Sequence, residues 1–422
     1  MARRDERSLK NPVPITFDGE EILAEQGEPI AATLIAAGHV ALARSPKFHR
    51  PRGPACMRAA CDGCLARVDG VPNVMTCLAP AEKGTRVESQ NTLGPRDLDL
   101  LRMTDWFFPK GMNHHELFAG VPGVQRVMQV FARRVAGLGK LPGDAAPPRP
   151  AERTRDDGLV VGSGPGGMAV ASAFAARGRK VRVIDDALEW GGGARALPRA
   201  AFETIATPFA ELVADGAVRF DARTTACAVY GDDVLVVGPE GAEVASAKTL
   251  VLAAGAHDGV LAFDGNDVPG VMSARAAGFL AQRSIVPGKR VVVCRAPGSD
   301  GVFGEAFART VRDRGLDCEV TVLEGEPVVA RGTSRVKEVS VREGATVRAL
   351  SADAFLVDAP RAPAYELAEQ AGAVIAFAEG AFRITAPKGK IRDGVLVAGE
   401  LAGVAFEARA LKAQADRVAD SA

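Results

Sequence analysis

The fold is decided by one stretch of sequence, Gly158-Leu-Val-Val-Gly162-Ser-Gly164-Pro-Gly166-Gly167. A short apolar segment leads into a run of glycines, and small residues that favour a helix, Met168 to Arg177, follow it. Strand, glycine turn and helix form the context that the dinucleotide-binding pattern G-x-G-x-x-G requires. Gly162 permits the tight turn, Gly164 lets a pyrophosphate approach the backbone, and Gly167 allows close packing of helix on strand.

The segment after this helix completes a strand–helix–strand unit, the start of a doubly wound α/β fold. The apolar run Lys180 to Asp185 is expected to be the next strand, and Asp185 ends it where an acid takes ribose hydroxyls. An acid at this position suits an unphosphorylated ribose, so the pattern predicts FAD or NAD rather than NADP. The residues that we assign to cofactor binding in this unit are Gly162, Gly164, Pro165, Gly166, Gly167 and Asp185.

A second unit of the same kind follows later in the chain. Arg290 to Cys294 and Glu319 to Glu324 are expected strands, with a helix between them over Val302 to Arg314. The turn reads Ala296-Pro-Gly298-Ser-Asp-Gly301, so alanine replaces the first glycine and proline follows it. Glu324 ends the second strand, where an NAD ribose acid would lie. Two interpretations stay open: a purely structural nucleotide fold, or one that binds NAD or an adenine nucleotide.

The cysteines form the second strong pattern. Four of the seven fall in one segment with the spacing C-x4-C-x2-C-x12-C: Cys56, Cys61, Cys64 and Cys77. A tight loop with a fourth thiolate close behind can surround the two irons of a [2Fe-2S] cluster, and Asp62-Gly63 supplies a flexible corner that lets backbone amides point at the sulfurs. Structural zinc is the alternative, but zinc sites usually pair two C-x2-C motifs, and only Cys61 and Cys64 form one here. A chance grouping is the third interpretation.

Composition excludes several classes of protein. Lys plus Arg and Asp plus Glu are both 52, so the chain lacks the basic excess that nucleic-acid binding usually needs. Hydrophobic residues are 47% and charged residues 25%, as in ordinary globular proteins. No apolar run reaches the roughly 20 residues that span a bilayer, and no apolar segment of a secretory signal follows the charged start. The expected compartment is therefore the cytoplasm.

Several segments resemble known families. The cysteine spacing resembles that of the ferredoxin-like domains of the xanthine dehydrogenase type and, more closely, the small iron–sulfur domain of hydrogen cyanide synthase and opine oxidase. Ser45-Pro-Lys-Phe-His-Arg-Pro-Arg-Gly53 resembles a run near the start of the sarcosine oxidase alpha subunit. Thr249 to His257 and Gly394 to Gly403 resemble two flavin motifs of disulfide-reductase-like flavoproteins. These motifs imply FAD, with Gly255, Gly399 and Glu400 in contact with it, although most such proteins carry Asp at the last position.

Together the patterns predict an α/β and β-grasp architecture. The order strand, strand, helix, loop and strand over residues 13–90 is that of a β-grasp, here a ferredoxin-like [2Fe-2S] domain. Residues 91–150 are expected to be a helical connector that ends in a Pro-rich linker. A flavoprotein with two dinucleotide-binding folds follows: residues 155–280 plus 355–422 form the FAD-binding domain, and residues 281–354 an inserted, degenerate NAD-like domain.

The resemblance runs from about residue 13 to residue 410 and is to subunits of multi-subunit amine and amino-acid dehydrogenases: sarcosine oxidase alpha, opine oxidase, hydrogen cyanide synthase and dye-linked proline dehydrogenase. In that family a separate beta subunit, itself a flavoprotein, removes hydride from the substrate and the alpha subunit relays electrons. The resemblance therefore implies a hetero-oligomer with a beta-type flavoprotein amine oxidase or dehydrogenase. This sequence lacks a counterpart of the folate-binding half of sarcosine oxidase alpha and a second cysteine cluster.

The sequence assigns no catalytic residue. His257 is the only histidine close to a cofactor motif. In the connector, Trp106 to Phe108 are candidate anchors for a partner or fill a domain seam, whereas adjacent His114 and His115 would point about 100° apart on a helix and share a metal poorly. Two other functions stay open: a self-contained NAD(P)H-dependent flavin and iron–sulfur reductase, or a structural subunit with vestigial cofactor sites.

Overall fold

The computed structural model describes residues 9–45, 48–90, 150–378 and 381–422, with a few isolated residues besides. Almost all of the connector lies outside the described residues. The expected helices at 95–103 and 123–137, the aromatic run Trp106 to Phe108 and the cluster His114 to Glu116 lie there too. Among the helices that are described, none is both long and apolar enough to cross a membrane.

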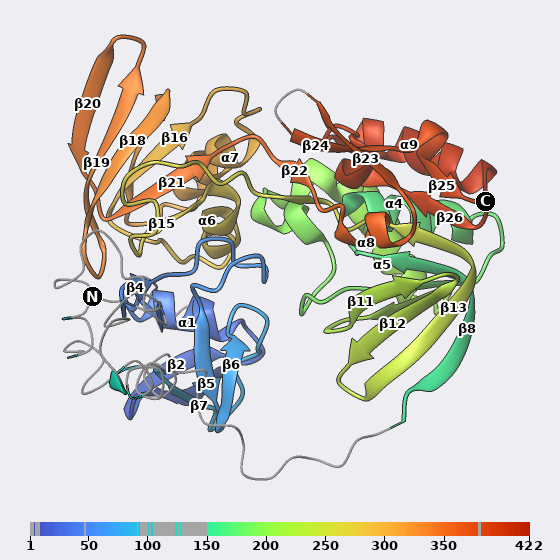
Figure 1. The fold of residues 1–422 in the computed structure, drawn as a ribbon, viewed down its shortest axis with the longest axis horizontal. Helices are drawn as coiled ribbons and strands as arrows, with labels where there is room; N and C mark the ends of the chain where they lie inside the picture. The colour runs from blue at the N-terminus through green and yellow to red at the C-terminus, as the bar shows by residue number, and fades with distance from the viewer. Residues whose placement is uncertain are drawn as a thin grey trace. The chain divides into compact units, whose positions relative to one another are not determined.

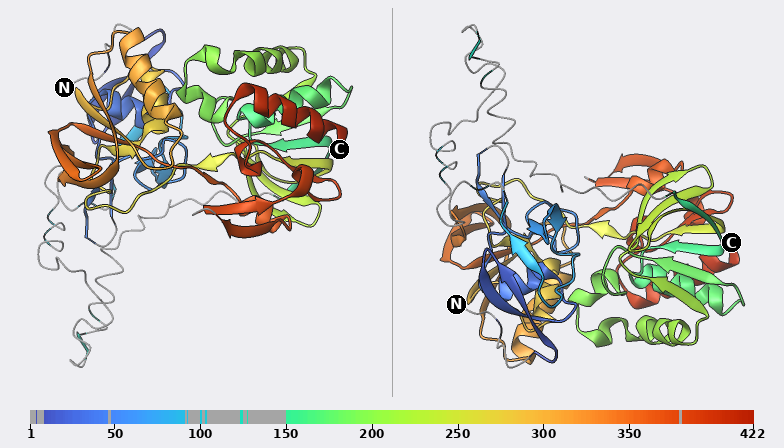
Figure 2. Two further views of the ribbon diagram at one scale, coloured as in Figure 1. Left: turned by 90° about the horizontal axis from the view of Figure 1, so that it is seen from above. Right: turned by 90° about the horizontal axis from the view of Figure 1, so that it is seen from below.

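Contacts divide the chain into two compact units, shown in Figures 1 and 2. The first unit comprises Met1–Ala145, Leu261–Ala296 and Arg314–Val357. The second unit comprises Ala146–Val260, Pro297–Asp313 and Asp358–Ala422.

The N-terminal part of the first unit is a β-grasp, drawn in blue in Figure 1. Its sheet has the order β2-β1-β7-β5-β6, and β1 pairs antiparallel with β2 and parallel with β7. The strands are β1 Pro12–Phe17, β2 Glu20–Glu25, β5 Leu65–Val68, β6 Val71–Met75 and β7 Arg86–Glu88. Helix α1, Ile30–Ala36, is buried at every residue because its side chains are almost all apolar, and Gly38 ends it with a φ of 99°.

The rest of the first unit holds two sheets. A four-stranded sheet has the order β15-β21-β16-β17, and a three-stranded antiparallel sheet has the order β18-β19-β20. Their strands, with helix α6 Ala274–Ala281, are β15 Val271–Ser273, β16 Arg290–Arg295, β17 Glu319–Glu324, β18 Glu326–Gly332, β19 Val336–Glu343, β20 Thr346–Ser351 and β21 Ala354–Asp358.

The four-stranded sheet differs in one respect from the domain limits expected from the sequence. Strand β15 and nearly all of β21 fall in the ranges 155–280 and 355–422 that we assigned to the FAD-binding domain, yet they pair with each other in parallel, Val271 opposite Phe355, beside β16. Only pairing between distant segments shows which sheet such short strands join, and local sequence patterns do not contain that information.

The second unit is built on an eight-stranded sheet. Six of its strands have the order β10-β9-β8-β13-β12-β11, and the other two are β26, which pairs with β13, and β25, which pairs with β26. The parallel strands are β8 Glu152–Val161, β9 Val181–Ile184, β10 Val218–Asp221, β13 Gly241–Leu252 and β26 Val395–Val397. The antiparallel strands are β11 Thr225–Tyr230, β12 Asp233–Gly238 and β25 Lys390–Arg392. Helix α4, Pro165–Ala175, packs against both α5, Glu203–Ala214, and α9, Ala408–Asp420.

Smaller elements complete the second unit: β14 Ala256–His257, α7 Val302–Asp313, β22 Ala362–Pro363, α8 Glu366–Gln370, β23 Val374–Ala378 and β24 Ala381–Thr385. The register of the main sheet decides where a ligand can bind. Leu252 at the end of β13 lies opposite both Val161 at the end of β8 and Val397 at the end of β26. Three strands therefore end together, and ligands of such sheets bind outside the carboxyl ends of the strands.

Candidate functional site

The four clustered cysteines lie in two pairs. The Sγ atoms of Cys56 and Cys61 are 3.4 Å apart, and the thiols of Cys64 and Cys77 are also in hydrogen-bond contact. All four are free thiols, and only Cys61 is not fully buried. The sequence predicted these residues as ligands, and the fold brings all of them to the one loop that precedes β5 and to the end of β6.

Backbone N–H groups point at the sulfurs of this loop. The amides of Arg58 and Ala60 donate to Cys56 Sγ over 3.4 and 3.2 Å, and the amide of Ala59 donates to Cys77 Sγ over 3.3 Å. Met57 and Ala59 have φ angles of 54° and 60°, the left-handed conformation that turns successive amides inward. Hydrogen bonds to sulfur stabilise the negative charge of iron–sulfur clusters and tune their potential, so the loop fits such a group.

Within each pair of cysteines, the hydrogen bond shifts the two thiol pKa values in opposite directions. The hydrogen bond from Cys56 lowers the pKa of Cys61 to about 6, and the hydrogen bond from Cys77 lowers the pKa of Cys64. The donors Cys56 and Cys77 have pKa values raised by the same bonds and by burial. One thiol of each pair is therefore disposed to ionise, and thiolate is the form that binds metal.

The arrangement bears on the choice between a cluster and zinc. Two pairs of thiols are the set that a [2Fe-2S] cluster takes when each iron is held by two cysteines. The donor set thus fits the two-iron cluster that the spacing predicted.

The cysteine loop is held firmly within the first unit. A Cβ on Gly63 would lie 1.9 Å from the carbonyl oxygen of Gly53, so only glycine fits there. The carbonyl of Ala55 accepts from the amide of Ser273 over 2.8 Å, and Arg52 forms an ion pair with Asp267. These contacts tie the loop to the segment that leads into helix α6. The amide of Gly63 donates to Cys61, as expected for the Asp62-Gly63 corner.

The glycines of the first fingerprint lie where three strands of the second unit end. Gly162 has a φ of 103°, and a Cβ there would lie 2.4 Å from the carbonyl oxygen of Ala253, just beyond β13. A Cβ on Gly167 would lie 1.9 Å from the carbonyl oxygen of Gly162, so glycine is required for α4 to pack this close to the turn. A Cβ on Gly166 would lie 2.7 Å from the Cα of Gly399, which brings the C-terminal flavin motif onto the start of α4.

Gly164, unlike Gly162, Gly166 and Gly167, has open space where a Cβ would lie. A Cβ there would meet only the Cα of Gly192, at 3.9 Å, so the space beside it is open. Gly164 is also the N-cap of α4, Pro165 opens the helix, and no side chain caps it. The free N–H groups of a helix start bind anions. An open glycine cradle at an uncapped helix is what a dinucleotide pyrophosphate requires, so the residues present fit such a group.

A second glycine run faces this cradle. The amide of Gly191 donates to the carbonyl of Ser163 over 2.9 Å, and a Cβ on Gly192 would lie 2.7 Å from the Cα of Gly164. Sequence reasoning missed these residues. The signal was present in the run Trp190-Gly-Gly-Gly193, because three consecutive glycines indicate a close approach of backbone.

Asp185, the acid at the end of β9, holds the fingerprint turn. Its Oδ2 atom accepts from both the amide and the hydroxyl of Ser163, over 2.6 and 2.7 Å, and its Oδ1 atom accepts from the amide of Ala187 over 2.9 Å. A carboxylate offers about four acceptor sites, so capacity for a further hydroxyl remains on Oδ1. The ribose contact predicted for Asp185 stays a prediction.

Glu400 makes a contact that the sequence did not suggest. Its Oε1 atom accepts from Nε of Arg361 over 2.7 Å, and the other guanidinium nitrogens of Arg361 meet Asp300 at 3.0 and 2.8 Å. The guanidinium also lies over the rings of Phe303 and Phe406. Burial lowers the pKa of Arg361, but Asp300 and Glu400 outweigh it and hold that pKa above its usual value. The predicted contact of Glu400 with the cofactor remains untested.

Gly255 and His257 follow the end of β13. Gly255 has a φ of 75°, and its carbonyl accepts from the amide of Ala364 over 3.0 Å. His257 pairs through Nε2 with Glu366 at 2.8 Å, and the two side chains are 41% and 58% exposed. This exposed pair gives His257 a structural partner and does not mark it as a catalytic base.

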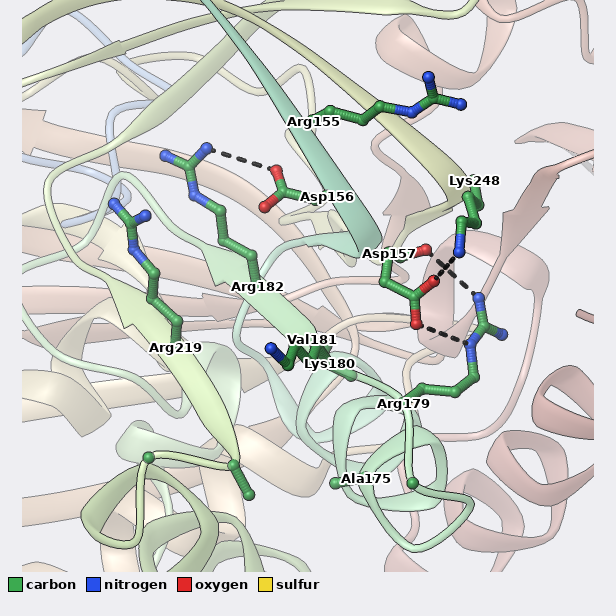
Figure 3. Close-up of a pocket in the computed structure, with 13 residues that line it drawn as sticks. Arg155, Asp156, Asp157, Ala175, Arg179, Lys180, Val181, Arg182, Arg219 and Lys248 are labelled. Carbon is green, nitrogen blue, oxygen red and sulfur yellow. Dashed lines mark hydrogen bonds and ion pairs between the residues drawn. The ribbon is translucent and has the colours of Figure 1, made fainter.

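A basic pocket lies at the opposite end of the same strands (Figure 3). Asp157 meets Lys248 at 2.9 Å and Arg179 at 4.0 Å, and the buried Arg182 meets Asp221 at 2.8 Å. The cationic residues that line it are Arg155, Arg179, Lys180, Arg182, Arg219 and Lys248. Ligands of doubly wound sheets bind at the carboxyl ends of the strands, so this pocket at their amino ends is separate from the glycine cradle.

Two families match the chain in separate regions. Residues 10–92 match the family described as "2Fe-2S iron-sulfur cluster binding domain". Residues 156–390 match the family described as "Pyridine nucleotide-disulphide oxidoreductase". The expected fold class, a ferredoxin-like domain followed by a disulfide-reductase-like flavoprotein fold, is thereby confirmed.

The chain is also similar to named proteins. The sarcosine oxidase alpha subunit of Rhizobium meliloti (strain 1021) is 27% identical over 78% of this chain, and that of Corynebacterium sp. (strain P-1) is 26% identical over 66%. The chain spans only 36% and 27% of the lengths of these relatives. The crystal structure of L-proline dehydrogenase from P. horikoshii superposes with a TM-score of 0.73 and 20% identity, over 99% of this chain and 75% of that one. The resemblance to the alpha-type subunit is therefore confirmed.

Proposed function

The chain belongs to the pyridine nucleotide-disulphide oxidoreductase family, and we propose that it is the electron-transfer subunit of a complex that oxidises an amine or amino acid. Sarcosine, proline, glycine or an opine would be the kind of substrate. A beta-type flavoprotein subunit would abstract the hydride, and this chain would relay the electrons onward.

Two groups of residues would hold the cofactors in this proposal. Cys56, Cys61, Cys64 and Cys77 would hold a [2Fe-2S] cluster. The backbone around Gly162 to Gly167, with Asp185, Gly255, Gly399 and Glu400, would hold FAD. When bound, FAD supplies two-electron chemistry and the cluster one-electron chemistry. The residues of this chain would position these groups. Three of the four cysteines are shielded from water and amides donate to their sulfurs, and the free N–H groups at the start of α4 would bind the pyrophosphate.

The observation that carries the proposal is the coexistence of two fitted sites in one chain. Four free thiols in two pairs, with amides donating to them, suit a one-electron carrier. An open glycine cradle at an uncapped helix start suits a dinucleotide. A flavin combined with a one-electron carrier is the composition of a relay, because it converts hydride chemistry into single-electron transfer.

The substrate class and the partner derive from the named relatives. Sarcosine oxidase and L-proline dehydrogenase both act on secondary amines, and an alpha subunit implies further subunits. Hydride abstraction needs a group that keeps the substrate nitrogen neutral beside the flavin. Among the histidines that the structure describes, His257 is the one near a dinucleotide motif, and it is engaged with Glu366 at the surface, which favours a substrate site on the partner.

The compartment that we propose is the cytoplasm. Seven cysteines, all free among the described residues, suit a reducing environment. The proposal is checked by the location of the native protein after cell fractionation.

The function is tested by expressing the chain alone and together with the product of a neighbouring gene, and by assaying dye reduction with sarcosine, proline, glycine and opines. The chain alone should show no turnover, and the co-purified complex should oxidise at least one of these amines. Robust turnover by the isolated chain would overturn the relay and place the substrate site within these residues. A complex that copurifies but never oxidises an amine would overturn the substrate class.

A further inference from the structure

The second nucleotide fold differs from the first at the start of its helix. Residues 296–301 follow β16 and lead into α7, where a pyridine-nucleotide fingerprint would lie. In such a fingerprint the pyrophosphate takes backbone N–H groups of the first helical turn. A pyridine nucleotide, which the family name implies, could bind here only if these N–H groups are free to donate to its pyrophosphate.

Two of them are already taken by the chain itself, because the amide of Val302 donates to Oδ1 of Asp300 over 3.3 Å and the amide of Gly304 donates to Asp358. The Oδ2 atom of Asp358 accepts from the amide of Gly304, in the first turn of α7, over 2.7 Å. Its Oδ1 atom meets the hydroxyl of Ser299 at 3.0 Å. Asp358 is only 3% exposed, and its burial raises the pKa of the carboxyl. The carboxyl group of Asp358 occupies the space beside the Gly304 amide in either protonation state. When it is ionised, it also repels a phosphate.

The loop is fixed from its other side by Arg361. The guanidinium meets both carboxylate oxygens of Asp300 within the loop, at 3.0 and 2.8 Å, and Glu400 at 2.7 Å. The side chain of Arg361 is 11% exposed and lies over the ring of Phe303 in α7. A loop clamped by an ion pair cannot easily shift to admit a dinucleotide.

We propose that Asp358 closes the second nucleotide fold to NAD(P)H, with Arg361 as the residue that positions the closed loop. The carboxyl of Asp358 replaces the pyrophosphate at the start of α7, so reducing equivalents do not enter the chain from a pyridine nucleotide bound there. This inference concerns a different site from the proposed function and holds whichever dinucleotide the first fingerprint binds.

The test measures NADH binding to the full chain by isothermal titration calorimetry and by NADH fluorescence. The measurements use a Gly164→Val background, in which the first fingerprint cannot contribute. The chain with Asp358 intact should show no saturable binding. Asp358→Ala should gain saturable NADH binding, with a Kd at least about tenfold below the highest NADH concentration at which the parent shows none, because an N–H donor is freed and a negative charge removed. Thermal unfolding reports whether each variant is folded.

Two results would overturn the inference. Saturable NADH binding with Asp358 intact would show that the fold is open. A folded Asp358→Ala variant that still does not bind NADH would show that Ala296 and Pro297, not Asp358, exclude the ligand. If Asp358→Ala does not fold, Asp358→Asn retains an acceptor for Gly304 and removes the charge. It must then bind NADH more tightly than the parent, and equal affinity would count against the proposal.

Discussion

The two nucleotide folds of this chain share the order strand, turn and helix but differ in what lies at the helix start. At α4 the turn is made of glycine, no side chain caps the helix, and the space beside Gly164 is open. At α7 the carboxyl of Asp358 occupies the amide of Gly304, and Asp300 is clamped by Arg361. One fold thus presents backbone donors to a ligand, and the other satisfies them internally.

The second fold has the packing of a nucleotide fold, although side chains of the chain itself accept from the amides at its helix start. The strands β16 and β17 still pair over their whole lengths, and α7 still buries Phe303 and Phe307. Site chemistry and fold are therefore separable in this chain, and the following changes test that separation.

The largest effect is expected from Gly167→Ala. Its new Cβ would lie 1.9 Å from a backbone oxygen of Gly162, which cannot move without breaking the turn. We expect a loss of about 3 kcal/mol or more in the free energy of unfolding, measured by urea denaturation. Gly164→Ala is the matched control, because its Cβ lies 3.9 Å from the nearest atom. Equal stability of the two variants would contradict the account of this turn.

Cys61→Ser should abolish the iron–sulfur cluster and leave the second unit unchanged. Serine is a poor ligand for iron, and its loss breaks the pair with Cys56. Iron analysis should fall from about two atoms per chain to near zero, while bound flavin stays constant. Cys227→Ser, at an exposed cysteine outside the loop, should retain all of the iron. Stoichiometric zinc without iron in the parent chain would refute the cluster itself.

Gly164→Val should release the first dinucleotide without unfolding the chain. The valine side chain would fill the open space where a pyrophosphate must approach, and its φ of −65° is ordinary for valine. Flavin affinity should fall by about 100-fold or more, a penalty of about 3 kcal/mol, and the cluster should remain. Retention of flavin at parental affinity would place the cofactor elsewhere. Release of NAD instead of flavin from the parent chain would correct the identity of the cofactor.

Arg361→Lys should lower stability moderately. Lysine keeps the charge but cannot bridge Asp300 and Glu400 with a planar fork. Because Asp300 is 45% exposed, we expect a loss of only about 1–3 kcal/mol. Arg331→Lys is the control, since Arg331 and Glu338 are 70% and 49% exposed, and it should change stability by less than about 0.5 kcal/mol. A similar effect of both changes would mean that the clamp contributes little.

The smallest effect is expected from Ala296→Gly, which restores the first glycine of the second fingerprint. If Asp358 is what closes the fold, this change should not produce NADH binding, and stability should fall by no more than about 1 kcal/mol. NADH titrations of Ala296→Gly and Asp358→Ala, run side by side, check this prediction. Binding gained by Ala296→Gly alone would move the cause of closure from Asp358 to the turn.

The sequence predicted the parts of these sites that depend on local spacing. Four cysteines within one segment and glycines between a strand and a helix are contiguous signals, and the structure brings each set together. Arg361 and Asp358 could not be predicted, because Asp358 is 54 residues from the amide that it accepts from, and no local pattern reports such a contact. The same holds for β15 and β21, whose shared sheet is evident only from their pairing.

The central claim, that electrons enter this chain from another subunit and not from a pyridine nucleotide, is tested most directly by anaerobic reduction of the purified, cofactor-loaded chain. Visible absorption is followed during separate titrations with NADH and with dithionite. Dithionite should bleach the absorption of both flavin and cluster, and excess NADH should bleach neither. Rapid and complete bleaching by NADH would contradict the account and identify the chain as a self-contained NADH-dependent reductase.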